Sequence, residues 1–170
     1  MNITTSPARR LVLLDIENVC RGDLHGTFAN AVARVERTIG SLRDDQVTVA
    51  ACARTYRHIG WSNPGWRYLA REGQDGADLA LLEVLEGERL SERFDRVVIA
   101  SGDHIFAPAV VRLTRQGVHV TVVAHRDALA ASLRLAAHEV RWINHNPHGP
   151  AVSYVRPFPT LSLAHLRNAA

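Results

Sequence analysis

The sequence predicts an α/β fold in which a mainly parallel sheet lies between two layers of helices. Short apolar runs, typical of buried parallel strands, alternate with segments whose apolar residues recur every three or four positions. The chain has 170 residues, which suits one domain with a sizeable core. This alternation favours parallel strands joined by helices, and such crossovers are right-handed.

Five segments have the apolar and β-branched composition of strands. They are residues 11–14, 46–53, 96–100, 118–124 and 140–143. The first run, Leu-Val-Leu-Leu, stops at Asp15, and the third, Val-Val-Ile-Ala, stops at Ser101-Gly102-Asp103. Because binding crevices in open α/β sheets lie at the carboxyl ends of the strands, we expect these polar residues to converge at one edge.

The connecting segments are predicted to be helical where apolar residues follow the 3.6-residue period. The predicted helices are residues 27–41 with Thr27 as the cap, 65–70 after Pro64, 77–90, 105–116 before the stop at Gly117, and 129–138. Residues 54–64 are expected to form a loop because they are polar and aromatic without a clear period.

The domain is predicted to span residues 9–143. Residues 144–170 begin with a linker rich in Asn, His and Pro, and this short C-terminal tail includes a helix over 161–168. The sequence has no apolar run long enough for a membrane span, no signal peptide and two cysteines. These features favour a cytoplasmic protein without membrane contact and without a disulfide framework.

The charge of the chain gives only a weak indication of whether it binds nucleic acid. The formal net charge is +3, and all 20 basic residues are arginine. Arginine is the better side chain for bidentate phosphate contacts. A source with GC-rich codons would give the same composition, so composition alone does not identify a nucleic-acid ligand.

Three acidic motifs carry the chemistry that the sequence predicts. Asp15 begins Asp-Ile-Glu-Asn, Asp78 lies at the start of an apolar helix, and Asp103 ends Ser-Gly-Asp. Carboxylates that converge repel one another unless a cation lies between them, so we expect a site for a hard metal ion. Each motif also has a structural explanation, because acids are favoured at strand ends, in turns and at helix N-termini.

Together the motifs resemble the NYN domain, a branch of the PIN-like nuclease superfamily. The resemblance rests on Asp15-Ile16-Glu17-Asn18, Gly76-Ala77-Asp78 and Ser101-Gly102-Asp103 in this order, and on the following helix with Phe106 and Val110. The segment 128–142 is similar to the last helix and strand of the NYN domain in animal meiosis-arrest RNA-binding proteins, and bacterial NYN proteins share the pattern. The resemblance covers about residues 9–143.

The resemblance implies a three-layer Rossmann-like, PIN-like fold and a nuclease that cleaves RNA phosphodiesters with Mg²⁺ or Mn²⁺. It makes Asp15, Asp78 and Asp103 the expected metal ligands and catalytic residues, with Asn18 shaping the site. A homodimer is a further expectation from the superfamily, although no apolar stripe in the sequence indicates an interface. Residues expected to shape the site or bind phosphate are Asn18, Ser101, Glu17, Asp75 and His104.

One departure from the family pattern supports an alternative. Family members often carry an acid or amide two residues after Ser-Gly-Asp, and this chain has Ile105 there. The site would then have three carboxylates, with Glu17, Asp75 or His104 as candidates for the missing ligand. The alternative is an RNA-binding or scaffold module with an incomplete metal site. A haloacid-dehalogenase-like enzyme is disfavoured by the absence of lysine, and a dinucleotide-binding domain by the absence of a Gly-x-Gly-x-x-Gly loop.

The expected substrate contacts follow the second strand. Arg54, Arg57 and Arg71 are the candidate contacts to single-stranded or structured RNA, and Trp61 and Trp66 lie among them. Arginine next to aromatic residues fits RNA because phosphates pair with guanidinium groups and bases stack on rings. The two tryptophans have an equally simple explanation as cover for the edge of the core.

Overall fold

The computed structural model describes residues 8–20, 28–59, 63–87, 89–143 and 153–155. Its sheet has the strand order β3-β2-β1-β4-β5-β6-β7. The strands are β1 (Arg10–Asp15), β2 (Gln46–Ala51), β3 (Arg67–Ala70), β4 (Arg96–Ala100), β5 (His119–Ala124), β6 (Glu139–Trp142) and β7 (Ser153–Val155). Neighbouring strands from β3 to β6 run parallel, and β7 pairs antiparallel with β6.

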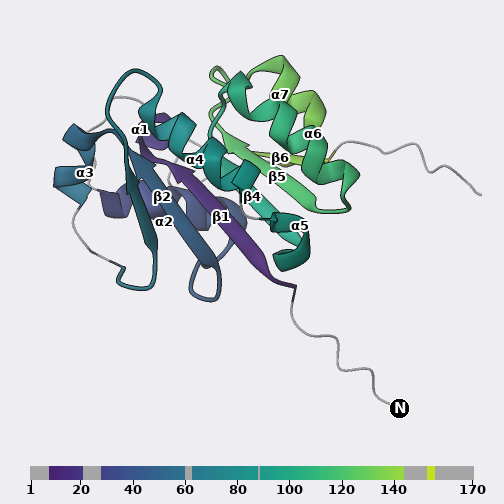
Figure 1. The fold of residues 1–170 in the computed structure, drawn as a ribbon, viewed down its shortest axis with the longest axis horizontal. Helices are drawn as coiled ribbons and strands as arrows, with labels where there is room; N and C mark the ends of the chain where they lie inside the picture. The colour runs from purple at the N-terminus through teal and green to yellow at the C-terminus, as the bar shows by residue number, and fades with distance from the viewer. Residues whose placement is uncertain (1–7, 21–27, 60–62, 88, 144–152, 156–170) are drawn as a thin grey trace, which may run out of the picture.

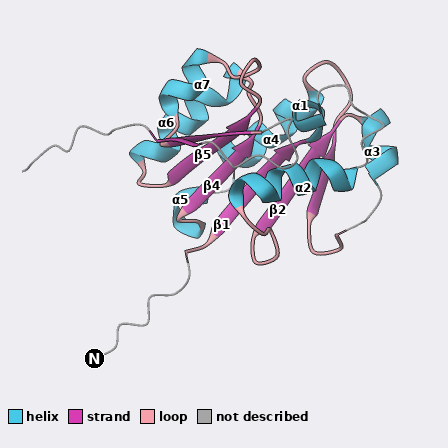
Figure 2. Cartoon of the chain, turned by 180° about the vertical axis from the view of Figure 1, so that it is seen from behind, coloured by secondary structure: helices cyan, strands magenta, loops and turns pink. Residues whose placement is uncertain are grey.

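Helices cover both faces of the sheet, so the predicted three-layer α/β fold is confirmed (Figures 1 and 2). One face packs against α1 (Ile16–Cys20), α2 (Phe28–Ile39) and α3 (Ala53–Ile59). The other face packs against α4 (Gly76–Gly87), α5 (Leu90–Arg93), the 3₁₀ turn η1 (His104–Phe106), α6 (Ala107–Arg115) and α7 (Ala131–Ala136).

The central strand β1 shows why its sequence is a continuous apolar run. Leu11 and Leu13 belong to the core beneath α4 and α6, whereas Val12 and Leu14 belong to the core beneath α1 and α2. All four side chains are fully buried. A strand buried on both faces has no solvent side for polar residues, so the first polar position, Asp15, lies where the strand ends.

Two local predictions were wrong. Residues 54–64 were expected to form a loop, but α3 occupies Ala53–Ile59, with Thr55 and Ile59 buried on one side. Residues 65–70 were expected to form a helix, but β3 pairs in parallel with β2 over Arg67–Ala70. In both segments tertiary packing overrides a weak local signal.

Aromatic contacts explain why β3 is a strand at the sheet edge. The Trp66 and Tyr68 rings both lie 6.3 Å from the Phe28 ring of α2, measured between centroids. A helix over these residues would lose the ladder to β2 that places both rings on α2. Helix α1, helix α5 and strand β7 were also not predicted, because each has only three to five residues. The predicted helix over 161–168, the cap Thr27 and Trp61 lie outside the described residues.

Candidate metal centre at the carboxyl edge of the sheet

The three predicted acidic residues all lie at the edge of the sheet where β1 and β4 end, and Asp15 and Asp78 line the same pocket. Asp15 is the last residue of β1, Asp78 lies in the first turn of α4, and Asp103 is the N-cap of η1 directly after β4. Because β1 and β4 are hydrogen-bonded neighbours in register, their polar ends must lie side by side. The convergence of these motifs follows from strand order, which the sequence alone does not specify.

Asp15 and Asp78 form a carboxyl pair. Asp15 is only 3% exposed. Burial, followed by the charge of Asp78, raises the pKa of Asp15 from its ordinary value of 3.8 to about 8. The two carboxyl groups also hydrogen-bond to each other, which requires a shared proton when no cation is present.

Asp78 lies in an unusually negative environment. Burial is the largest cause that raises its pKa, and the charges of Asp103, Asp75 and Glu17 raise it further, while its hydrogen bond to Asp15 opposes them. Its Oδ1 atom is buried and accepts no hydrogen bond. A buried carboxylate oxygen without a partner costs free energy, so this atom is suited to a ligand that is absent from the polypeptide itself.

Asn18 and Ser101 connect the two strand ends. The Asn18 backbone N–H donates to Asp15 Oδ1 at 3.2 Å, and Asn18 Oδ1 accepts from the Gly102 N–H at 3.2 Å. Ser101 hydrogen-bonds to the Asp15 side chain, and its Oγ accepts from the Asp103 N–H at 3.3 Å. The site-shaping role predicted for Asn18 and Ser101 is consistent with these contacts, which fix Asp15 relative to the loop after β4.

Asp103 is held by its own turn. Its Oδ1 accepts from the Ile105 N–H at 2.9 Å and lies 2.9 Å from His104 Nδ1. Ile105 is partly buried and packs against the core beneath α6, so its side chain serves packing.

Within the described residues, no group of three or more Asp, Glu, His or Cys side chains is arranged as a ready-made metal site.

Glu17 is fixed in the wall of the site. Its Oε1 accepts from the Cys52 N–H at 2.9 Å and from Thr55 Oγ1 at 3.1 Å, which ties α1 to the start of α3. A pocket at this edge is lined by Asp15, Glu17, Asn18, Asp78 and Ala128. Glu17 is therefore placed beside the Asp15–Asp78 pair.

Asp75 is exposed, adopts a left-handed backbone with φ of 58°, and does not line the pocket.

Replacing Glu17 with alanine should separate α3 from this wall. The substitution leaves the partly buried Cys52 N–H without its acceptor, so we expect the free energy of unfolding to fall by about 2 kcal/mol. Urea unfolding followed by circular dichroism measures this change. Glu83→Ala is the matched control, because Glu83 is exposed and pairs with the exposed Arg71. Equal effects of the two substitutions would contradict an anchoring role for Glu17.

The loop after β5 forms another wall of the pocket through Ala128, and the sequence did not indicate this. Gly102 packs directly against the backbone of this loop, because a Cβ at Gly102 would lie 2.3 Å from the Ala128 carbonyl oxygen. The Ala130 N–H donates to the Gly102 carbonyl at 2.9 Å. This close approach of the two backbones is what requires a glycine here. No sequence signal links Ala128 to the site.

The predicted RNA contacts differ in their surroundings. Arg54 and Arg57 are exposed on α3, next to the anchored Glu17. Arg71 is also exposed, but its guanidinium pairs with Glu83. Trp66 packs on Phe28, in agreement with a role as cover for the core edge.

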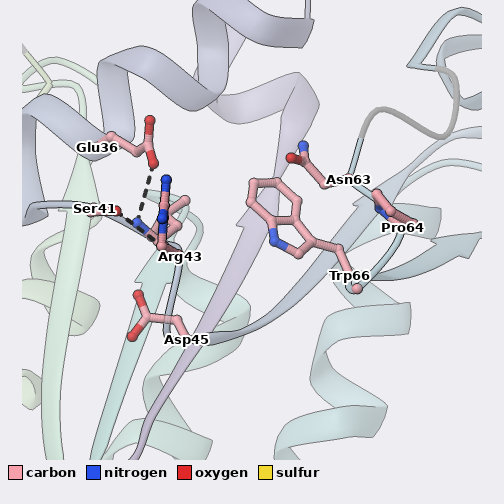
Figure 3. A pocket seen from close by; sticks show the side chains of 9 residues that line it. Glu36, Ser41, Arg43, Asp45, Asn63, Pro64 and Trp66 are labelled. Carbon is pink, nitrogen blue, oxygen red and sulfur yellow. Dashed lines mark hydrogen bonds between the residues drawn. The ribbon is translucent and has the colours of Figure 1, made fainter.

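A second pocket lies at the opposite edge, where β2 and β3 begin (Figure 3). Arg43 lies on one side of it, and Asn63 and Trp66 lie on the other. Its two acids have structural partners, since Glu36 accepts from the Leu42 N–H and Asp45 holds Arg10. Carboxyl groups with a raised pKa occur at the other edge, which favours that edge as the reactive site.

Part of the chain matches a known protein family. The NYN domain family model matches residues 73–144, which include Asp78 and Asp103. The resemblance to the NYN domain family is confirmed. The search of curated proteins found no match.

Two solved structures are similar to this NYN-like chain. A protein of unknown function from Vibrio parahaemolyticus has a TM-score of 0.61 and 19% identity, over 84% of this chain and 98% of that one, and it shows the same fold. A protein from Leishmania major described as a putative MAR1 ribonuclease has a TM-score of 0.37 and 15% identity, over 76% and 71% of the two chains. No helix in the described part of the chain has the length and apolar character needed to cross a membrane.

Proposed function

We propose that the chain is a metal-dependent ribonuclease that hydrolyses RNA phosphodiester bonds at the Asp15–Asp78 pair. The observation that carries the proposal is the pairing of the buried Asp15 carboxyl group with the half-buried Asp78 carboxyl group in a polar pocket, where the buried Asp78 Oδ1 has no hydrogen-bond partner. The match to the NYN domain family supports nuclease-type, RNA-related chemistry at this pocket.

The donor set fits Mg²⁺ or Mn²⁺. Both ions prefer oxygen ligands, and Mg²⁺ commonly binds one or two carboxylates together with water and substrate phosphates. Asp15 and Asp78 would hold the ion, with Asp103 as the third carboxylate. Such an ion would supply an activated water and would offset the negative charge that develops on the phosphate.

The remaining residues hold this arrangement in place. Asn18 and Ser101 orient the Asp15 carboxyl group through the contacts described above. Glu17 presents a further carboxylate in the pocket wall, with Oε1 already engaged by Cys52 and Thr55. In the protein without metal, the Asp15–Asp78 pair retains one proton at neutral pH, and that proton must leave when a cation binds.

A specific observation also favours a second function, an RNA-binding module without turnover. The Asp103 carboxylate is already engaged by the Ile105 N–H and by His104, and Ile105 replaces the acid or amide expected from the family. A weakened third ligand would leave RNA binding intact while lowering metal affinity.

Cleavage of labelled single-stranded RNA tests the proposal. We expect cutting with Mn²⁺ or Mg²⁺, none with EDTA, and a loss of about a hundredfold in Asp103→Asn, because one charged ligand is removed. RNA binding by both proteins with no cutting by either would favour the binding module. Cutting that continues in EDTA would contradict metal-dependent chemistry.

A further inference from the structure

An arginine on the far side of the pocket has the features of a nucleic-acid contact. Arg126 follows β5 by two residues, and its Cζ lies 5.4 Å from the centroid of the Trp142 ring at the end of β6. Arg126 is exposed, whereas Trp142 is partly buried and packs against the core. The ring therefore provides a fixed support for an exposed cation.

Arg126 also differs from the arginines that stabilise the fold. In the described part of the chain its guanidinium has no carboxylate partner. Several other arginines have one, and these pairs are Arg10–Asp45, Arg71–Glu83, Arg112–Glu86 and Arg141–Glu139. A guanidinium held over an indole ring loses less side-chain freedom when it binds a phosphate, and its outer face can stack on a base.

The order of strands in the sheet places Arg126 near the carboxylates. In the sheet, β5 is the second strand from β1, so at about 4.8 Å per strand the two carboxyl ends are roughly 10 Å apart. On the other side of β1, α3 follows β2 and carries the exposed Arg54 and Arg57. Figure 1 shows α3 and α7 on opposite sides of this edge, with α1 and α4 between them.

We propose that Arg126, supported by Trp142, binds a backbone phosphate of single-stranded RNA beside the bond that is cut. An RNA strand that crosses the carboxyl edge meets the arginines of α3, the acidic pocket and then Arg126 in this order. A single strand fits better than a duplex, because its bases are free to stack on the guanidinium. This inference rests on the proposed function, since RNA is its ligand.

Equilibrium binding in EDTA tests the inference apart from catalysis. The probe is fluorescein-labelled single-stranded RNA, and its anisotropy is measured over a range of salt concentrations. Arg126→Ala should weaken binding about fivefold and lower the slope of log affinity against log salt by about 0.7, as expected for one lost phosphate contact on a single strand. Arg126→Lys should restore the slope but only part of the affinity, because lysine keeps the charge without the planar guanidinium.

Arg115→Ala is the matched control. Arg115 is exposed at the end of α6, at the opposite edge of the sheet, and its loss removes the same charge. We expect a change below twofold for this variant. Equal weakening in the two alanine variants would show that only net charge matters and would overturn the inference, while leaving the nuclease proposal standing. Absence of RNA binding by the wild-type protein in EDTA would overturn the inference, whereas the cleavage assay with Mn²⁺ or Mg²⁺ decides the nuclease proposal separately.

Discussion

Replacing Asp15 with asparagine should remove cleavage activity and, at pH 8, stabilise the metal-free protein. Activity should fall by about a thousandfold, because asparagine is neutral and cannot offset the charge of a bound cation. Stability should change in the opposite direction, because the buried carboxyl group near Asp78 is costly to ionise. Initial rates of RNA cleavage and thermal unfolding in EDTA measure the two effects.

The sign of the stability effect follows from the pKa of Asp15. In the folded protein this pKa is raised to about 8, whereas the ordinary value is 3.8. Between these pH values the folded state binds more protons than the unfolded chain, so the free energy of unfolding falls as the pH rises. Asparagine has no proton to lose, so the variant should gain on the order of 3 kcal/mol relative to wild type between pH 5 and pH 8.

Asp44→Asn provides the control for this experiment. Asp44 is an exposed aspartate before β2, at the opposite edge of the sheet, and its loss changes the net charge equally. Its unfolding profile should follow that of the wild-type protein at every pH. A wild-type protein whose stability in EDTA does not decline from pH 5 to pH 8 would show that the Asp15–Asp78 pair is not as buried as the structure indicates.

Gly102→Ala is expected to damage fold and site together. Its Cβ would lie 2.3 Å from the Ala128 carbonyl oxygen and 2.8 Å from the carbonyl carbon, so the backbone of one segment must move. We expect the free energy of unfolding to fall by about 3 kcal/mol, as in overpacked cores. The shift would also displace the Gly102 N–H from Asn18, and activity should fall beyond what lower stability explains. Chemical denaturation and cleavage rates at a temperature where the variant stays folded test both effects.

Gly65→Ala is the matched substitution. A Cβ at Gly65 meets no atom within 4 Å, and the backbone there does not have a positive φ. This variant should keep its stability within about 0.5 kcal/mol and should keep full activity. If Gly102→Ala were equally harmless, the close packing of the loop after β5 against the Ser101–Gly102 backbone would be wrong.

Much of the fold could be predicted because the strong signals are local. The continuous apolar run before Asp15 indicated a strand buried on both faces, and the helix predicted over 105–116 contains the observed α6 at 107–115. The segments that were missed or predicted wrongly are short, and packing against neighbouring elements decides their secondary structure. Residues 67–70 form a strand because β2 offers a ladder and Phe28 accepts the aromatic rings, and neither partner is near in sequence.

The candidate site shows the same division. Carboxylates at strand ends were evident from the motifs of Asp15, Asp78 and Asp103, because polar residues that directly follow buried runs are conspicuous. The hydrogen-bond partners of each carboxyl group were not evident from the motifs. The pairing of Asp15 with Asp78 and the anchoring of Glu17 depend on contacts that span different elements.

The sequence by itself determined the fold class and the edge of the sheet at which chemistry is expected, because apolar periodicity and the polar ends of strands are local properties. The tertiary structure decided which acids share a proton, why Gly102 must be glycine and where Arg126 lies relative to the pocket. These properties arise from burial and from the order of strands in the sheet. Both depend on residues far apart in the chain, so no local pattern encodes them.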